Sequence, residues 1–146
     1  MVRTEAAAGR AGDASDAGAA DAPTAPVVID TNIALDLLVF DDPCWAGLRA
    51  ALAAGGLRWI ASPPMRVELA RDARAPQAVL AAFDAAAHLV HAVPARAPFV
   101  CKDTDDQMFI DLAVAHRARL LSKDGAVLSM RKRLATLGVA VAPAFG

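Results

Sequence analysis

Short apolar runs alternate with longer amphipathic segments along most of the chain. The runs are rich in Val, Ile, Leu and Ala, which is typical of buried strands. They predict strands at residues 27–29, 57–61, 89–93, 119–121 and 139–142. The segments between them repeat apolar residues at the helical spacing. They predict helices at residues 32–40, 43–54, 63–69, 76–87, 105–117 and 126–137.

Capping signals mark several of these helix ends. Asp42-Pro43 and Ser62-Pro63 each place a capping side chain before a proline at the first helical position. Gly55-Gly56 is expected to end the helix that begins at Pro43.

The alternation of strands and helices predicts an α/β domain. Its βαβ units would form a mainly parallel sheet of four to five strands, covered by helices on both faces. Right-handed crossovers place the carboxyl ends of parallel strands at one edge of the sheet. Because ligand sites in open parallel sheets lie at that edge, acids that follow the strands are candidates for a shared site.

The first 25 residues differ in composition from the rest of the chain. They consist mainly of Ala, Gly, Asp, Thr and Pro, so we expect a disordered low-complexity tail at residues 1–25. Residues 26–146 suit one domain. The tail holds four of the 16 acids and two of the 15 basic residues, which leaves that domain close to neutral. Any nucleic-acid binding must therefore depend on a local patch or on metal.

The cysteines and the apolar runs bear on the cellular compartment. Cys44 and Cys101 lack the spacing of a disulfide framework or zinc site, so we interpret them as reduced, partly buried thiols. The N-terminal stretch has no apolar core typical of a secretory leader, and no apolar run approaches the length of a membrane span. We expect a cytoplasmic protein without a membrane partner.

The predicted topology places four acids near the carboxyl edge of the sheet. Asp30 ends the first strand, and Asp124 follows the fourth. Glu68 lies about one and a half turns into the helix after the second strand. Asp106 lies in the first turn of the helix that precedes the fourth strand. We expect these four carboxylates to converge on one concave spot.

Such a cluster points to metal chemistry. Carboxylates without a matching Lys or Arg are costly to hold together unless a cation binds between them. Oxygen ligands without His or Cys favour Mg²⁺ or Mn²⁺. One or two such ions support phosphodiester hydrolysis by polarising the phosphate and acidifying a water molecule.

Each acid also has a purely structural interpretation. Asp30 suits a helix cap, and Glu68 alone is commonly a solvated helix acid. Residues 103–106 form a plausible N-terminal cap cluster, and Asp124-Gly125 is a normal turn pair. Only the joint placement of the acids favours a metal site.

Four segments carry a family resemblance. They are Val28 to Asn32 (VIDTN), Met65 to Leu69 (MRVEL), Asp103 to Ile110 (DTDDQMFI) and Leu120 to Asp124 (LLSKD). In this order they resemble the motifs of the PIN-domain family, over roughly residues 26–143. The chain is similar in particular to the bacterial toxin components of toxin–antitoxin pairs, the VapC-type nucleases and their relatives.

The resemblance implies a three-layer α/β/α sandwich and a metal-dependent endoribonuclease that hydrolyses RNA phosphodiester bonds. It implies Mg²⁺ or Mn²⁺ as cofactor, RNA as substrate, a cognate antitoxin protein as partner, and frequent homodimers. The implied catalytic metal ligands are Asp30, Glu68, Asp106 and Asp124. The polar residues implied around them are Asn32, Ser122 and Asp103.

The third ligand is open among Asp103, Asp105 and Asp106. We choose Asp106 because it lies seven residues before Ala113, the spacing to a small helix residue that the resemblance implies. Lys123 is expected either to contact phosphate or to pair locally with Asp124.

Other chemistry-bearing residues receive structural interpretations. We interpret the scattered His88, His91 and His116 as surface or structural residues, and Trp45 and Trp59 as core or dimer-interface residues. The run Arg131-Lys132-Arg133 is interpreted as a solvated face, with phosphate contact as the alternative.

Three other functions fit parts of the pattern. A receiver-like signalling module also places acids at a sheet edge, but Asp41-Asp42 lie far from the first strand and no Lys follows Val141. An aspartyl phosphatase needs a second acid two residues after its nucleophile, where this chain has Asn32. A non-catalytic binding module on the same fold stays an alternative, although all four acids are present.

Overall fold

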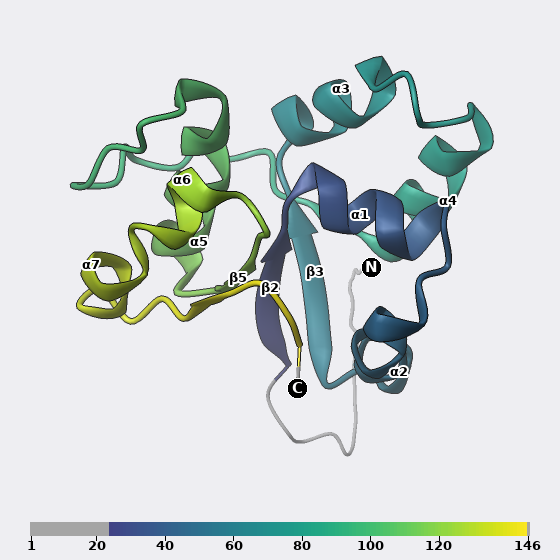
Figure 1. Cartoon of the computed structure of the whole chain (residues 1–146), viewed down its shortest axis with the longest axis horizontal. Coiled ribbons are helices and arrows are strands. Elements are labelled where there is room, and N and C mark those ends of the chain that lie inside the picture. The colour runs from purple at the N-terminus through teal and green to yellow at the C-terminus, as the bar shows by residue number, and fades with distance from the viewer. Residues whose placement is uncertain (1–23, 146) are drawn as a thin grey trace.

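The computed structural model describes residues 24–145, shown in Figure 1. The segment expected to be disordered, residues 1–25, therefore lies outside the described residues except for its last two. Of these two, Ala25 begins the first strand of the sheet.

A five-stranded sheet forms the centre of the described part. Its strands run in the order β4-β3-β2-β5-β6, and every neighbouring pair is parallel. The prediction of a mainly parallel sheet is confirmed. The strands are β2 (Ala25–Ile29), β3 (Leu57–Ala61), β4 (His88–Leu89), β5 (Arg119–Leu121) and β6 (Val141–Ala142).

Helices follow most strands, as the alternation predicts. They are α1 (Thr31–Leu38), η1 (Pro43–Trp45), α2 (Ala46–Ala54), α3 (Pro63–Arg71), α4 (Ala78–Ala86), η2 (Thr104–Asp106), α5 (Gln107–His116), α6 (Gly125–Leu128) and α7 (Arg131–Ala135). The predicted cap positions are present, although the Ser62 side chain forms no cap hydrogen bond. Asp42 caps η1, Ser62 precedes Pro63 at the start of α3, and Gly55 ends α2 with a left-handed φ of 83°.

Several predicted elements differ from those observed. The helix expected at 105–117 begins as the 3₁₀ turn η2 before α5, and the strand expected at 139–142 is reduced to β6. The strand expected at 89–93 is only β4, because the chain leaves the sheet after the Val90 amide donates to the Ala61 carbonyl (2.7 Å). The helix expected at 43–54 begins as a 3₁₀ turn, η1, before α2. The helix expected at 126–137 is divided into α6 and α7, with the buried Met130 between them.

Alternating side chains of β2 show that helices cover both faces of the sheet. Val28 packs with Ile110 and Leu120 in one hydrophobic cluster, on the face that α5, α6 and α7 cover (Figure 1). Val27 and Ile29 lie in a second cluster, on the face covered by α1 and α2. The domain is therefore an α/β fold with three layers.

None of the helices in residues 24–145 combines the length and the apolar character that crossing a membrane requires.

Candidate metal centre

Strand pairing brings Asp30 and Ser122 together at the carboxyl edge. Ile29 of β2 pairs with Leu121 of β5, so the residues that follow these strands are neighbours. The Asp30 amide donates to the Leu121 carbonyl (3.0 Å), and the Ser122 hydroxyl donates to Oδ2 of Asp30 (2.6 Å). Asp30 is 5% exposed and Ser122 is 0% exposed. The sheet itself therefore fixes the position of this carboxylate.

Asp30 also caps α1, as its structural interpretation predicted. Its Oδ1 accepts a hydrogen bond from the Ile33 amide (3.0 Å). Burial raises the pKa of Asp30 most strongly, hydrogen bonds from Ser122 and Ile33 lower it, and the nearby charge of Asp124 raises it. The cap and the metal interpretations do not exclude each other, because each carboxylate oxygen has further lone pairs.

Ser122 connects Asp30 to Asp124. While its hydroxyl donates to Asp30, the same oxygen accepts from the Asp124 amide (3.1 Å). Asp124 in turn caps α6, with Oδ1 accepting from the Ala126 amide (2.8 Å). Ser122 thus hydrogen-bonds an acid, as the resemblance implied.

Asp106 is the most strongly perturbed of the acids. It ends η2 and is half-buried, and its Oδ2 is buried without any hydrogen-bond partner in the described part of the chain. Burial, followed by the charges of Asp124 and Asp103, raises the pKa of Asp106 to about 7. A carboxylate oxygen buried without a donor is costly, so this atom favours either a proton or a cation.

Glu68 reaches the same place from α3. Its Oε2 accepts a hydrogen bond from the Thr31 hydroxyl at the start of α1. Asp30, Glu68, Asp106 and Asp124 all line one pocket of about 160 Å³. The structure therefore brings together the four acids that the sequence singled out.

A tighter grouping involves a partly different set of acids. Asp103, Asp106 and Asp124 each offer a carboxylate oxygen, and these oxygens lie within 4.8 Å of one another. Asp103, expected beside the ligands, also caps η2 by accepting from the Asp105 amide (3.0 Å). Asp106 and Asp124 belong to both sets, so they form the centre of the site. Asp105 instead lines a neighbouring groove.

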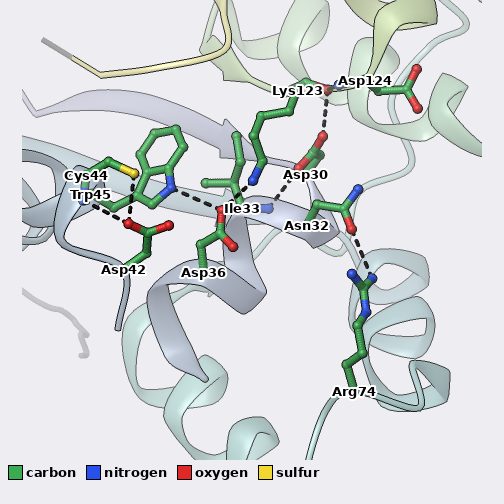
Figure 2. A network of polar contacts seen from close by, with 11 residues as sticks. Asp30, Asn32, Ile33, Asp36, Asp42, Cys44, Trp45, Arg74, Lys123 and Asp124 are labelled. Atoms are coloured by element: carbon green, nitrogen blue, oxygen red, sulfur yellow. Dashed lines mark hydrogen bonds and ion pairs between the residues drawn. The ribbon is translucent and has the colours of Figure 1, made fainter. Parts of the chain in front are cut away.

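Sequence reasoning missed a positive charge at the pocket. Asp72 and Arg74, in the loop after α3, line it together with Thr31, Asn32 and Phe109. Arg74 Nη2 donates to Oδ1 of Asn32 (2.9 Å) and to Oδ2 of Asp72 (2.8 Å); Figure 2 shows the Asn32 contact. Arg74 pairs with Asp72 and hydrogen-bonds none of the four acids, so among the described residues those acids have no matching Lys or Arg, as the sequence suggested. The available signal was the position of this loop, directly after the helix that carries Glu68.

Lys123 does not pair with Asp124. Its Nζ donates to Oδ2 of Asp36 on α1 (2.6 Å), and the Trp45 indole donates to the same oxygen (3.1 Å), as Figure 2 shows. The local pair expected from the sequence is therefore wrong. The ion pair instead ties the loop after β5 to α1.

The remaining residues of interest lie away from this centre. His88, His91 and His116 are exposed but not scattered: together with Arg58 they line one pocket of about 490 Å³. Trp45 and Trp59 are buried in the core. The run Arg131-Lys132-Arg133 is exposed on α7.

The donor set fits a hard divalent cation. Every ionisable side chain of the two acid sets is a carboxylate, which suits Mg²⁺ or Mn²⁺ rather than softer metals. The partnerless Oδ2 of Asp106 is a ligand atom without a donor. A bound cation would satisfy that oxygen and offset the repulsion between Asp106 and Asp124.

A family model described as the PIN domain matches residues 26–124, a range that includes all four acids. No curated protein matches the chain.

Proposed function

Because the chain belongs to the PIN-domain family, whose members are generally phosphodiester nucleases, we propose that it is a metal-dependent endoribonuclease that hydrolyses RNA phosphodiester bonds. The observation that carries this proposal is the convergence of Asp30, Glu68, Asp106 and Asp124 on one pocket. These acids come from four separate segments of the chain, so their meeting is a property of the fold and not of local sequence.

The four acids would hold Mg²⁺ or Mn²⁺, with Asp103 close enough to Asp106 and Asp124 to assist. When bound, such a cation supplies Lewis-acid polarisation of the phosphate and acidifies a water molecule.

The chain's own residues prepare this site. Ser122 fixes Asp30 and the backbone of Asp124, and Thr31 orients Glu68. Burial and the neighbouring acids raise the pKa of Asp106 to about 7, so part of the metal-free protein carries a proton there at neutral pH and would release it when a cation binds. Asp30 and Phe109 line the pocket and are themselves buried.

RNA cleavage by the purified protein, with Mn²⁺ or Mg²⁺ and with a chelator, tests the proposal. We expect metal-dependent internal cleavage of single-stranded RNA that disappears in Asp106→Asn and persists in Asp105→Asn. Asp105 is a matched control because it is adjacent to Asp106 in the chain but belongs neither to the pocket of four acids nor to the three-acid group. Equal activity of wild type and Asp106→Asn would overturn the proposal. Binding of RNA without cleavage would instead favour a non-catalytic module.

We also propose that the protein acts as the toxin of a toxin–antitoxin pair, with a cognate antitoxin as partner and a homodimer as its assembly. Support comes from the resemblance of the sequence motifs. Induced expression should arrest bacterial growth, and Asp106→Asn should not. Size-exclusion chromatography with light scattering measures the oligomeric state. Normal growth during expression of active enzyme would refute the toxin role but not the nuclease activity.

A further inference from the structure

Arg74 is a positive charge kept beside four carboxylates without neutralising them. Its hydrogen bonds go to Asp72 and Asn32, and none goes to the four acids of the pocket. It is therefore not their counter-ion. Its carboxylate partner is Asp72, and the rest of its guanidinium remains open to a second anion.

The guanidinium is held from two directions. Nε and Nη2 form a forked contact with Asp72 (3.0 and 2.8 Å), and Nη2 also reaches Asn32, which lies 42 residues away in sequence and two residues after Asp30. Such a fork fixes the plane of the guanidinium better than a single ion pair does. Arg74 is therefore positioned relative to the start of α1, the helix that Asp30 caps.

One face of this side chain remains open to solvent. The side chain is 53% exposed, and Nη1 donates to no acceptor within residues 24–145. The other base near the site, Lys123, is already paired with Asp36. Arg74 is paired as well, with Asp72, but of the two bases only Arg74 lines the pocket.

A nucleic acid that approaches the acids meets repulsion between its phosphates and their carboxylates. A fixed arginine at the pocket offsets that repulsion, and its planar donors match phosphate oxygens. We propose that Arg74 binds a backbone phosphate of the substrate beside the acidic pocket, and that Asp72 and Asn32 position its guanidinium. This inference rests on the proposed nuclease function and names the residue that contacts the substrate backbone.

Binding of a fluorescein-labelled single-stranded RNA, and of DNA of the same sequence, tests this inference. Anisotropy titrations use full-length protein with Asp106→Asn as the parent, so that no cleavage occurs, at constant Mg²⁺ and several KCl concentrations. Adding Arg74→Ala should weaken binding about tenfold, the loss expected for one charged hydrogen bond. The slope of log affinity against log salt should fall by about 0.7, as for one phosphate contact on a single strand.

Two further variants separate a phosphate contact from a general charge effect. Arg58→Ala removes the same charge from an exposed position on β3 that lines another pocket, so it should leave the affinity and the slope unchanged. If Arg74 serves only to neutralise Asp72, then Arg74→Ala with Asp72→Asn should bind as the parent does. We expect that double variant to stay weaker than Asp72→Asn alone.

The outcomes also separate this inference from the nuclease proposal. Unchanged affinity and slope in Arg74→Ala, equal losses in Arg58→Ala, or a parent that binds neither nucleic acid would each overturn the role of Arg74. Cleavage by the wild type is measured separately. If the wild type does not cleave RNA but the salt dependence of binding still changes in Arg74→Ala, only the nuclease proposal is refuted. If the wild type cleaves RNA and Arg74→Ala binds as the parent does, only the phosphate contact is refuted.

Discussion

The Ser122 hydroxyl donates a 2.6 Å hydrogen bond to Oδ2 of Asp30, although 92 positions separate the two residues in the chain. Both are buried, and Ser122 also accepts from the Asp124 amide. One small side chain thus fixes two of the four acids relative to each other. Its geometry depends on the pairing of β2 with β5 and not on any local motif.

Ser122→Ala should lower the free energy of unfolding by about 1–3 kcal/mol, because it leaves a buried carboxylate oxygen and a backbone amide without their partner. Mn²⁺ affinity should fall about tenfold, since residues that orient metal ligands commonly matter by that factor or more. Urea denaturation and calorimetry measure the two effects. Ser129→Ala is the control, because its exposed hydroxyl bonds only the Ala126 carbonyl. Equal values for both variants would contradict the bridging role.

Metal-free stability should depend on pH through Asp106. Its pKa is about 7 in the folded protein against an ordinary 3.8, because burial and neighbouring acids disfavour its charge. Between those values the folded state keeps a proton that the unfolded state has released, so the contribution to stability is lost as pH rises toward 7. Asp106→Asn should therefore melt above wild type at about pH 8 in chelator, with the difference shrinking toward about pH 4.

Thermal melts of Asp106→Asn, Asp105→Asn and wild type across this pH range check the sign. Asp105 is exposed, and its variant should follow the wild-type profile. A destabilised Asp106→Asn at high pH would show that repulsion among the acids does not govern the stability of the metal-free site.

Removing Lys123 and removing Asp36 should lower the free energy of unfolding by different amounts, although the two residues form one ion pair. Lys123 is 47% exposed, so Lys123→Ala should cost less than about 1 kcal/mol, as exposed ion pairs do. Asp36→Ala should cost more, about 1–3 kcal/mol, because it also leaves the buried Trp45 indole without its acceptor. Chemical denaturation of both single variants and the double variant gives the coupling energy between Lys123 and Asp36. Equal costs for the single variants would mean that Trp45 gains nothing from Asp36.

The meeting of Asp30, Ser122 and Asp124 at the carboxyl edge could be predicted from the sequence because topology alone decides it. In a parallel sheet, any residue that follows a strand lies at the carboxyl edge, and adjacent strands put such residues side by side. Strand periodicity and turn residues are local signals, and they were sufficient to identify β2 and β5.

The contacts made by long side chains and the paths of loops could not be predicted from local sequence patterns. The contact of Arg74 with Asn32 and that of Lys123 with Asp36 depend on how loops carry flexible side chains across gaps of 42 and 87 positions. The alternation at residues 89–93 satisfied a strand pattern, yet the edge position of β4 gave those residues only one neighbouring strand to pair with. Local pattern does not encode such tertiary limits.

Substitutions of the three acids at η2, two within it and one at its N-cap, should differ sharply in their effect on metal affinity. Asp106 belongs both to the pocket and to the tight three-acid group, so Asp106→Asn should lose Mn²⁺ binding by about a hundredfold or more. Asp103→Asn should lose about tenfold, because Asp103 is near the ligands but exposed. Asp105→Asn should bind as wild type does. Calorimetric titration of the three variants ranks them, and a loss in Asp105→Asn equal to that in Asp106→Asn would shift the ligand assignment by one residue.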